Sequence, residues 1–170
     1  MIVFSIILLI ISFLLQGILS NFLAYTSGAI SIFSTIYVLI TLLLLYPYFE
    51  NNKKKFLILL VIFGGLTDLV YCNTFLLNIS IFYMIYKFSN IFHFFLPYNL
   101  FTINFSNLLS IFLYHILTFL LLSLLKYDNY TFLMLTKILA SSIIMTIIYT
   151  TISYLFIKLI REKKELKEIK

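Results

Sequence analysis

The chain has 170 residues, of which 63% are apolar and 11% are charged, and its formal net charge is +6. A soluble domain of this length needs more charged residues to keep its surface hydrated, so the composition predicts an integral membrane protein. Nucleic-acid binding is not expected, because the basic residues sit beside apolar segments, where they set topology and contact anionic lipid headgroups. The single cysteine, Cys72, excludes an internal disulfide.

Six apolar runs approach the length of about 20 residues that a helix needs to cross a bilayer. We expect spans over residues 2–19, 29–48, 56–71, 75–96, 105–125 and 131–159. Pro47 and Pro97 mark the ends of the second and fourth spans, because proline does not continue a helix. The first run is too long for a signal peptide and is expected to stay uncleaved. The predicted fold class is an all-α integral membrane bundle of six transmembrane helices over residues 1–160, with a charged tail over 161–170.

The positions of the basic residues favour six spans over five. The segment 75–96 contains Lys87, and in the five-span alternative it is a re-entrant segment. Six spans place the basic residues of the 50–55 loop and of the tail on one side of the membrane: Lys53, Lys54, Lys55, Arg161, Lys163 and Lys164. Because Lys and Arg accumulate on the cytoplasmic side, we expect both termini in the cytoplasm and these residues at the membrane surface.

Ionisable residues inside the expected spans are candidates for function, since a charge in hydrocarbon is costly. The four are Asp68, Lys87, His115 and Lys137. Counted from the expected ends of their spans, Asp68 and Lys137 lie at nearly the same depth, so we expect them to face each other. The alternative is that hydroxyl groups cap Asp68 in a purely structural role. Lys87 is expected to pair with Asp68 or to line a polar cavity, and His115 to be hydrogen-bonded in the interior.

Two glycines precede Asp68 in the same expected span. Gly64 and Gly65 are predicted to let a second helix approach closely, which is the usual role of small residues between membrane helices. The sequence has no Gly-rich phosphate loop, no G-x-S-x-G or H-E-x-x-H motif and no metal-ligand cluster. We therefore expect neither an enzyme nor a cofactor or metal site.

The segment Phe63-Gly-Gly-Leu-Thr-Asp-Leu69, followed by Val-Tyr-Cys-Asn-Thr-Phe-Leu-Leu-Asn78, resembles the core of MreD, a family of rod shape-determining membrane proteins. The best matches are Gly65, Asp68, Leu69 and Asn78. The family has Leu-Gly directly after the turn, where this chain has Leu76-Leu77. Chain length and hydropathy also fit the family along the whole sequence.

The resemblance implies a non-enzymatic role in the bacterial cell-elongation machinery, in the plasma membrane, with effects on cell shape and peptidoglycan synthesis. The partners that it implies are an MreC-like bitopic protein, an MreB-like filament, and the synthase made of RodA and a class B penicillin-binding protein. The family is also similar in fold to the substrate-binding subunits of energy-coupling factor vitamin transporters, and such a subunit is the alternative function. Those subunits share an Ala-x-x-x-Ala pattern on the first span, whereas residues 2–19 here contain no alanine.

Overall fold

The computed structural model describes residues 2–27, 35–72, 74, 76–95, 99–124 and 131–168, and every regular element in these ranges is helical. The elements are α1 (Ile2–Ser27), α2 (Tyr37–Leu45), the 3-10 segment η1 (Tyr46–Asn52), α3 (Lys53–Thr67), the π-helical turn η2 (Asp68–Cys72), α4 (Leu77–Phe95), α5 (Leu100–Leu124) and α6 (Phe132–Glu168). The predicted all-α class is confirmed.

Among the residues that the structure describes, four helical segments are long and apolar enough to cross a membrane: α1, α3 with η2, α5 and α6. The apolar run Tyr37–Phe49, which covers α2 and part of η1, is shorter within the described residues. Residues 29–34 of the expected second span lie outside the described residues. The α4 helix is not among the four, and it carries Lys87 and Asn90 among its apolar residues. The helices thus support membrane character.

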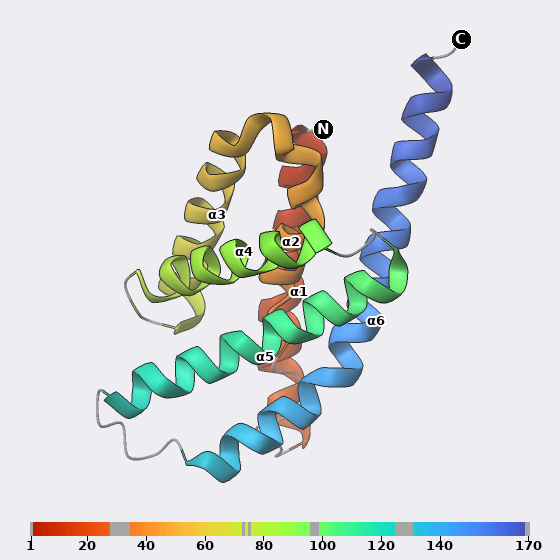
Figure 1. The fold of residues 1–170 in the computed structure, drawn as a ribbon. Coiled ribbons are helices and arrows are strands. Elements are labelled where there is room, and N and C mark those ends of the chain that lie inside the picture. Colours follow the sequence, from red (N-terminus) through yellow and green to blue (C-terminus); the bar gives the residue numbers. More distant parts are fainter. Residues whose placement is uncertain are drawn as a thin grey trace.

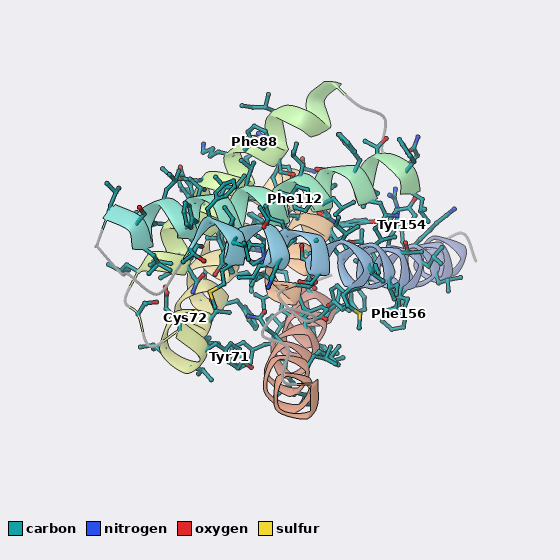
Figure 2. The ribbon with its side chains drawn as sticks, turned by 90° about the horizontal axis from the view of Figure 1, so that it is seen from below. Tyr71, Cys72, Phe88, Phe112, Tyr154 and Phe156 are labelled. Atoms are coloured by element: carbon teal, nitrogen blue, oxygen red, sulfur yellow. The ribbon has the colours of Figure 1, made fainter. Side chains whose placement is uncertain are left out.

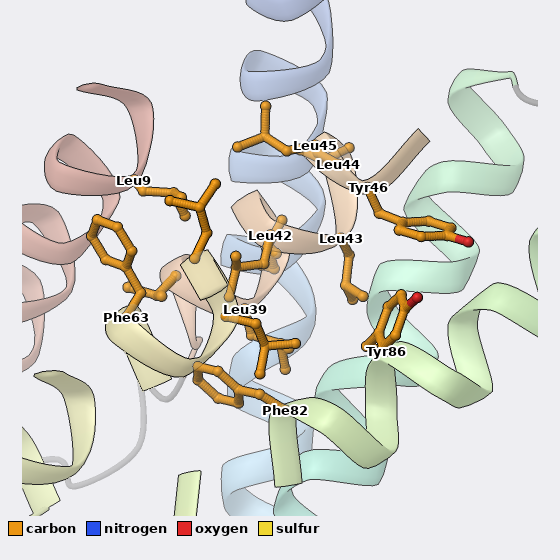
Figure 3. Close-up of a cluster of buried hydrophobic side chains, with 14 of the residues drawn as sticks. Leu9, Leu39, Leu42, Leu43, Leu44, Leu45, Tyr46, Phe63, Phe82 and Tyr86 are labelled. Carbon is orange, nitrogen blue, oxygen red and sulfur yellow. The ribbon is translucent and has the colours of Figure 1, made fainter. Parts of the chain in front are cut away.

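The α2 helix forms the centre of the bundle, because each of its residues is buried. It packs against α1, α4, α5 and α6. Figure 3 shows Leu39 and Leu42 of α2 between Phe63 and Tyr86, with Phe82 below Leu39. A run of leucine and isoleucine without charge fits this position, since a helix that is apolar all round is stable only when other helices or lipid surround it.

The helices run in two main directions (Figure 1): α1, α2 and α3 lie side by side, and α4 and α5 cross them. Figure 2, seen from below, agrees, because α1 appears end-on while α5 appears lengthwise. The α6 helix packs along α5 and α2 and then bends upward. Side-chain hydroxyls of Thr136, Ser141 and Ser142 donate to main-chain carbonyls one turn back, a contact that often bends helices.

Both termini lie at the same end of the bundle in Figure 1, which is also the end where η1 connects α2 to α3. The exposed lysines Lys53, Lys54 and Lys55 form the first turn of α3 at this end. The guanidinium carbon of Arg161 lies 5.8 Å from the centre of the Tyr48 ring in η1. Basic residues from two distant parts of the sequence therefore gather at one end. The side chains of Lys163 and Lys164 lie outside the described residues.

Several helix boundaries differ from the expected ones. Lys53, Lys54 and Lys55 begin α3 and are not part of a loop. The α1 helix continues to Ser27, past the expected end at Leu19, since the sequence places no proline or glycine between Gly17 and Gly28.

The α5 helix begins at Leu100 and not at Phe105, because Asn99 caps it. The side-chain oxygen of Asn99 accepts a hydrogen bond from the Thr102 amide at 2.8 Å, which satisfies a first-turn N–H that has no partner within the helix. The α6 helix begins next to Thr131, as predicted, and its helical backbone continues through the tail to Glu168.

Candidate functional site

Asp68, the one carboxylate inside an expected span, ends α3 where the chain tightens into the turn η2, and it is only 1% exposed. Its Oδ1 accepts hydrogen bonds from the Thr74 hydroxyl at 2.6 Å, from the Asn78 amide at 2.9 Å and from the Asn78 side-chain nitrogen at 3.1 Å. Its Oδ2 accepts from the amides of Asn78 at 3.1 Å and Ile79 at 3.4 Å. These amides belong to the first turn of α4, so Asp68 caps a helix that begins nine residues later.

Asn78 extends this contact to a third helix. Its side-chain oxygen accepts a hydrogen bond of 2.6 Å from the hydroxyl of Tyr114 in α5, and both residues are buried. The cluster of the buried residues Asp68, Asn78 and Tyr114 with the half-buried Thr74, which we call the Asp68 junction, therefore joins α3, α4 and α5. The Thr74 amide also donates to the main-chain oxygen of Asp68 at 3.1 Å, which closes the turn between α3 and α4.

Glycine lets α3 and α4 come together beside this junction. A Cβ atom built on Gly64 would lie 3.2 Å from the Cα atom of Ile79 and 3.4 Å from its nitrogen, closer than ordinary packing allows. The close approach expected at Gly64 is therefore present. A Cβ atom on Gly65 would meet only the Cδ1 atom of Ile79, at an ordinary 3.5 Å. The backbone contact thus depends on Gly64 and much less on Gly65.

Gly17 makes a second close contact, which was not predicted from the sequence. A Cβ atom on Gly17 of α1 would lie 2.6 Å from the hydroxyl oxygen of Tyr71. That hydroxyl donates to the main-chain oxygen of Phe13 at 2.6 Å, and the rings of Phe13 and Tyr71 lie 4.8 Å apart. The available signal was a lone glycine inside an apolar run, opposite an aromatic residue with a polar tip.

The predicted pairing of Asp68 with Lys137 is wrong. The alternative of capping by hydroxyl groups holds only in part, because one hydroxyl donates to Asp68 and the other donors are nitrogens of Asn78 and Ile79. The hydrogen bonds to Asp68 come from the junction, whereas Lys137 is exposed on α6. Two residues at the same depth can still face different directions, because depth does not define the rotation of a helix about its axis. Lys137 faces outward. In the part of the chain that the structure describes, neither Lys87 nor Lys137 forms an ion pair with Asp68.

Lys87 is also exposed, and neither pairing with Asp68 nor a polar cavity describes its position. Its Nζ atom lies 5.6 Å from the centre of the Tyr83 ring, one turn earlier on α4. His115 is buried as expected, with its ring edge-on to that of Tyr114 at 5.4 Å. Within the described residues, no three His, Cys, Asp or Glu side chains gather as a metal site requires.

A second set of interior polar groups lies between α6 and its neighbours α2 and α5. The buried members on α6 recur every three or four residues, on one helical face: Ser142, Thr146, Thr150 and Ser153. Thr35 contacts the Ser142 carbonyl at 3.3 Å and the Thr146 hydroxyl at 3.4 Å. Asn107 of α5 donates to Thr150 at 3.4 Å. We call this set the hydroxyl seam. Its spacing of three and four residues can be read in the sequence, but the seam was not predicted from it.

Two tyrosines beside the hydroxyl seam differ in hydrogen bonding, although their rings lie 4.7 Å apart. The Tyr149 hydroxyl contacts that of Thr41 at 2.8 Å, whereas the Tyr37 hydroxyl, on a residue only 2% exposed, has no hydrogen-bond partner among the described residues. We expect Tyr37→Phe to raise the free energy of unfolding by about 1 kcal/mol and Tyr149→Phe to lower it by a similar amount. Thermal unfolding in detergent measures both variants, and the opposite order of melting temperatures would contradict the prediction.

No family model matches this sequence, and neither the curated proteins nor the solved structures show a significant match to it. These comparisons therefore assign no family and no function. The candidate functional features of this chain are the Asp68 junction, the hydroxyl seam and the residues that the helices leave exposed.

Proposed function

We propose that this chain is a non-enzymatic, MreD-like membrane scaffold of the bacterial cell-elongation machinery, which takes part in cell shape and peptidoglycan synthesis in the plasma membrane. The observation that carries the proposal is the Asp68 junction with Gly64 beside it. Two of the best matches to the MreD family, Asp68 and Asn78, meet where α3, α4 and α5 join. Gly64 lies in the same segment, next to Gly65, which is the matched glycine. The polar groups of Asp68 and Asn78 form hydrogen bonds that hold the helices together. Such a structural role fits a protein that works by presenting helix surfaces to its partners.

The proposed topology is six crossings with both termini in the cytoplasm. Both termini lie at one end of the bundle, which fits an even number of crossings. Lys53, Lys54, Lys55 and Arg161 gather at that end, and basic residues concentrate on the cytoplasmic side of membrane proteins. In this topology α2 and α4 complete the six, with α2 held in the protein interior and α4 inclined across the other helices.

The outer surface is the part of the bundle that would meet partners. Large exposed apolar side chains are frequent on α1, α3 and α6, for example Leu14, Ile58 and Ile144. Apolar burial gains little against lipid, so partner helices would be held by close packing and by interhelical hydrogen bonds. The partners implied by the resemblance are an MreC-like bitopic protein, an MreB-like filament, and the RodA synthase with its class B penicillin-binding protein.

Purification of the tagged full-length chain from its native membrane tests the proposal, with mass spectrometry of the co-purified proteins. We expect the MreC-like protein or the wall synthase to be enriched relative to a matched preparation of an unrelated tagged multi-span protein. Depletion of the chain should then give rounded cells. Recovery of an ATPase pair with a transmembrane coupling subunit would contradict the scaffold and indicate a transporter subunit.

A further inference from the structure

The α4 helix has one buried face and one exposed face. Its buried residues pack into the bundle: Asn78, Ile81, Phe82, Ile85, Tyr86 and Ser89. The exposed residues recur at spacings of three and four and form a stripe along the other side: Tyr83, Met84, Lys87, Phe88 and Ile91. We call this stripe the outer face of α4. It is apolar, like a surface that faces lipid or another helix, except for the Tyr83 hydroxyl and the Lys87 ammonium group.

Lys87 lies near the middle of α4, about 12 Å along the axis from Phe95 and about 15 Å from Leu77 at 1.5 Å per residue. Its Nζ atom lies 5.6 Å from the centre of the Tyr83 ring, one turn earlier on the same helix. Helix side chains lean toward the N-terminus of their helix, so this direction is the ordinary one for a lysine on α4. The ammonium group lies beside the apolar residues of its own face.

The sequence has six acidic residues, and only Asp68 lies inside an expected span: Glu50, Asp68, Asp128, Glu162, Glu165 and Glu168. Asp68 is also the one whose side chain the structure describes, and its two oxygens already accept the hydrogen bonds of the Asp68 junction. A second copy of the chain offers the same six groups. In the proposed topology, a carboxylate beside Lys87 inside the membrane would therefore come from a different protein.

We propose that the outer face of α4 docks a transmembrane helix of a different protein, and that an Asp or Glu within that helix pairs with the ammonium of Lys87. The inference rests on the proposed function and deepens it, since it states the chemistry of a scaffold partner. Tyr83 contributes a ring face to the cation, and Met84 is an adaptable apolar contact one turn before Lys87. A buried pair of opposite charges also defines the register between the two helices, which apolar packing alone leaves loose.

Site-specific photocrosslinking in the native membrane tests the docking. A benzophenone amino acid replaces Met84 in the full-length chain, and an equivalent replacement of Ile58, exposed on α3, provides the control position. The expected crosslink from position 84 joins a partner span that contains an Asp or Glu. A crosslink only to phospholipid, only to a second copy of this chain, or to a span without an acidic residue would overturn the proposal.

Charge substitutions then test the ion pair. Lys87→Met should lower the yield of the position-84 crosslink at least about tenfold, Lys87→Arg should retain most of it, and Lys137→Met should leave it unchanged. Lys87→Glu should abolish the crosslink, and replacing the partner's acidic residue with lysine in that background should restore it. A yield that Lys87→Glu does not change would overturn the proposal, since the charge would then play no part.

The outcomes also separate this inference from the proposed function. If an acidic span is captured from a protein unrelated to wall synthesis, the α4 docking stands and the elongation role fails. If the wall-synthesis proteins co-purify while position 84 contacts only lipid, the scaffold role stands and the α4 docking fails.

Discussion

Asp68→Ala is expected to lower the free energy of unfolding by about 4 kcal/mol, or to prevent assembly of the bundle. The substitution removes both carboxylate oxygens and leaves the amides of Asn78 and Ile79 and the Thr74 hydroxyl without their acceptor. Asn78 is buried, and an unmade hydrogen bond there costs the full desolvation of the group, whereas Ile79 and Thr74 are half-buried and their donors lose less. The loss should loosen α4 from α3 first, because Asp68 caps the first turn of α4.

Graded variants distinguish this loss from a general effect of substitution. Asp68→Asn keeps one side-chain oxygen as an acceptor and should cost about half as much, while Thr74→Ala removes a single donor and should cost about 1 kcal/mol. Thermal unfolding and size-exclusion chromatography in detergent measure all three. An Asp68→Ala protein that is monodisperse and melts at the wild-type temperature would show that the junction does not hold the helices together.

Gly64→Ala is expected to lower the free energy of unfolding by about 2 kcal/mol, whereas Gly65→Ala should leave it unchanged or raise it by about 0.5 kcal/mol. Alanine favours helix over glycine at both positions. At Gly64 the added methyl group would lie 3.2 Å from the Cα atom of Ile79, and backbone cannot move aside as a side chain can. At Gly65 the nearest atom is the end of a flexible side chain at 3.5 Å.

The two glycine variants control for each other, since they are adjacent in the same helix and differ by the same methyl group. Their melting temperatures in one detergent should differ clearly, with Gly65→Ala higher. Equal melting temperatures would contradict the close approach of α3 and α4 at Gly64. A lower melting temperature for Gly65→Ala than for Gly64→Ala would mean that the helices meet on the opposite side of the glycine pair.

Local signals in the sequence predicted the elements well. Thr131 marks the start of α6 within one residue, because its hydroxyl caps the helix by accepting from the Met134 amide at 3.4 Å. Pro47 lies two residues after the end of α2, as its missing N–H requires. The close approach of a second helix at Gly64 was predicted from the small size of glycine alone. Asn99 is an equally local capping signal, but the prediction places the start of α5 at Phe105.

Contacts between helices were harder to predict than the helices themselves. The depths of Asp68 and Lys137 in the bundle can be counted from the residues before them. The directions in which their side chains point depend on helix rotations, which tertiary packing determines. The link from Asn78 to Tyr114 joins residues 36 apart, and no spacing rule connects them. The hydrogen bond from Tyr46 of η1 to Asn90 of α4, at 2.5 Å, is of the same kind. These contacts explain why the interior position of Asp68 was predicted correctly and its partner wrongly.

We propose a division of roles between the interior and the outer surface, in which Asp68 builds the bundle and the outer face of α4 binds a partner. The most direct measurement compares Asp68→Asn with Lys87→Met in parallel preparations, recording the melting temperature and the amount of co-purified partner per folded molecule. We predict that Asp68→Asn lowers the melting temperature and leaves the partner per folded molecule unchanged, while Lys87→Met does the reverse. An Asp68→Asn protein with the wild-type melting temperature that has lost its partner would contradict the claim.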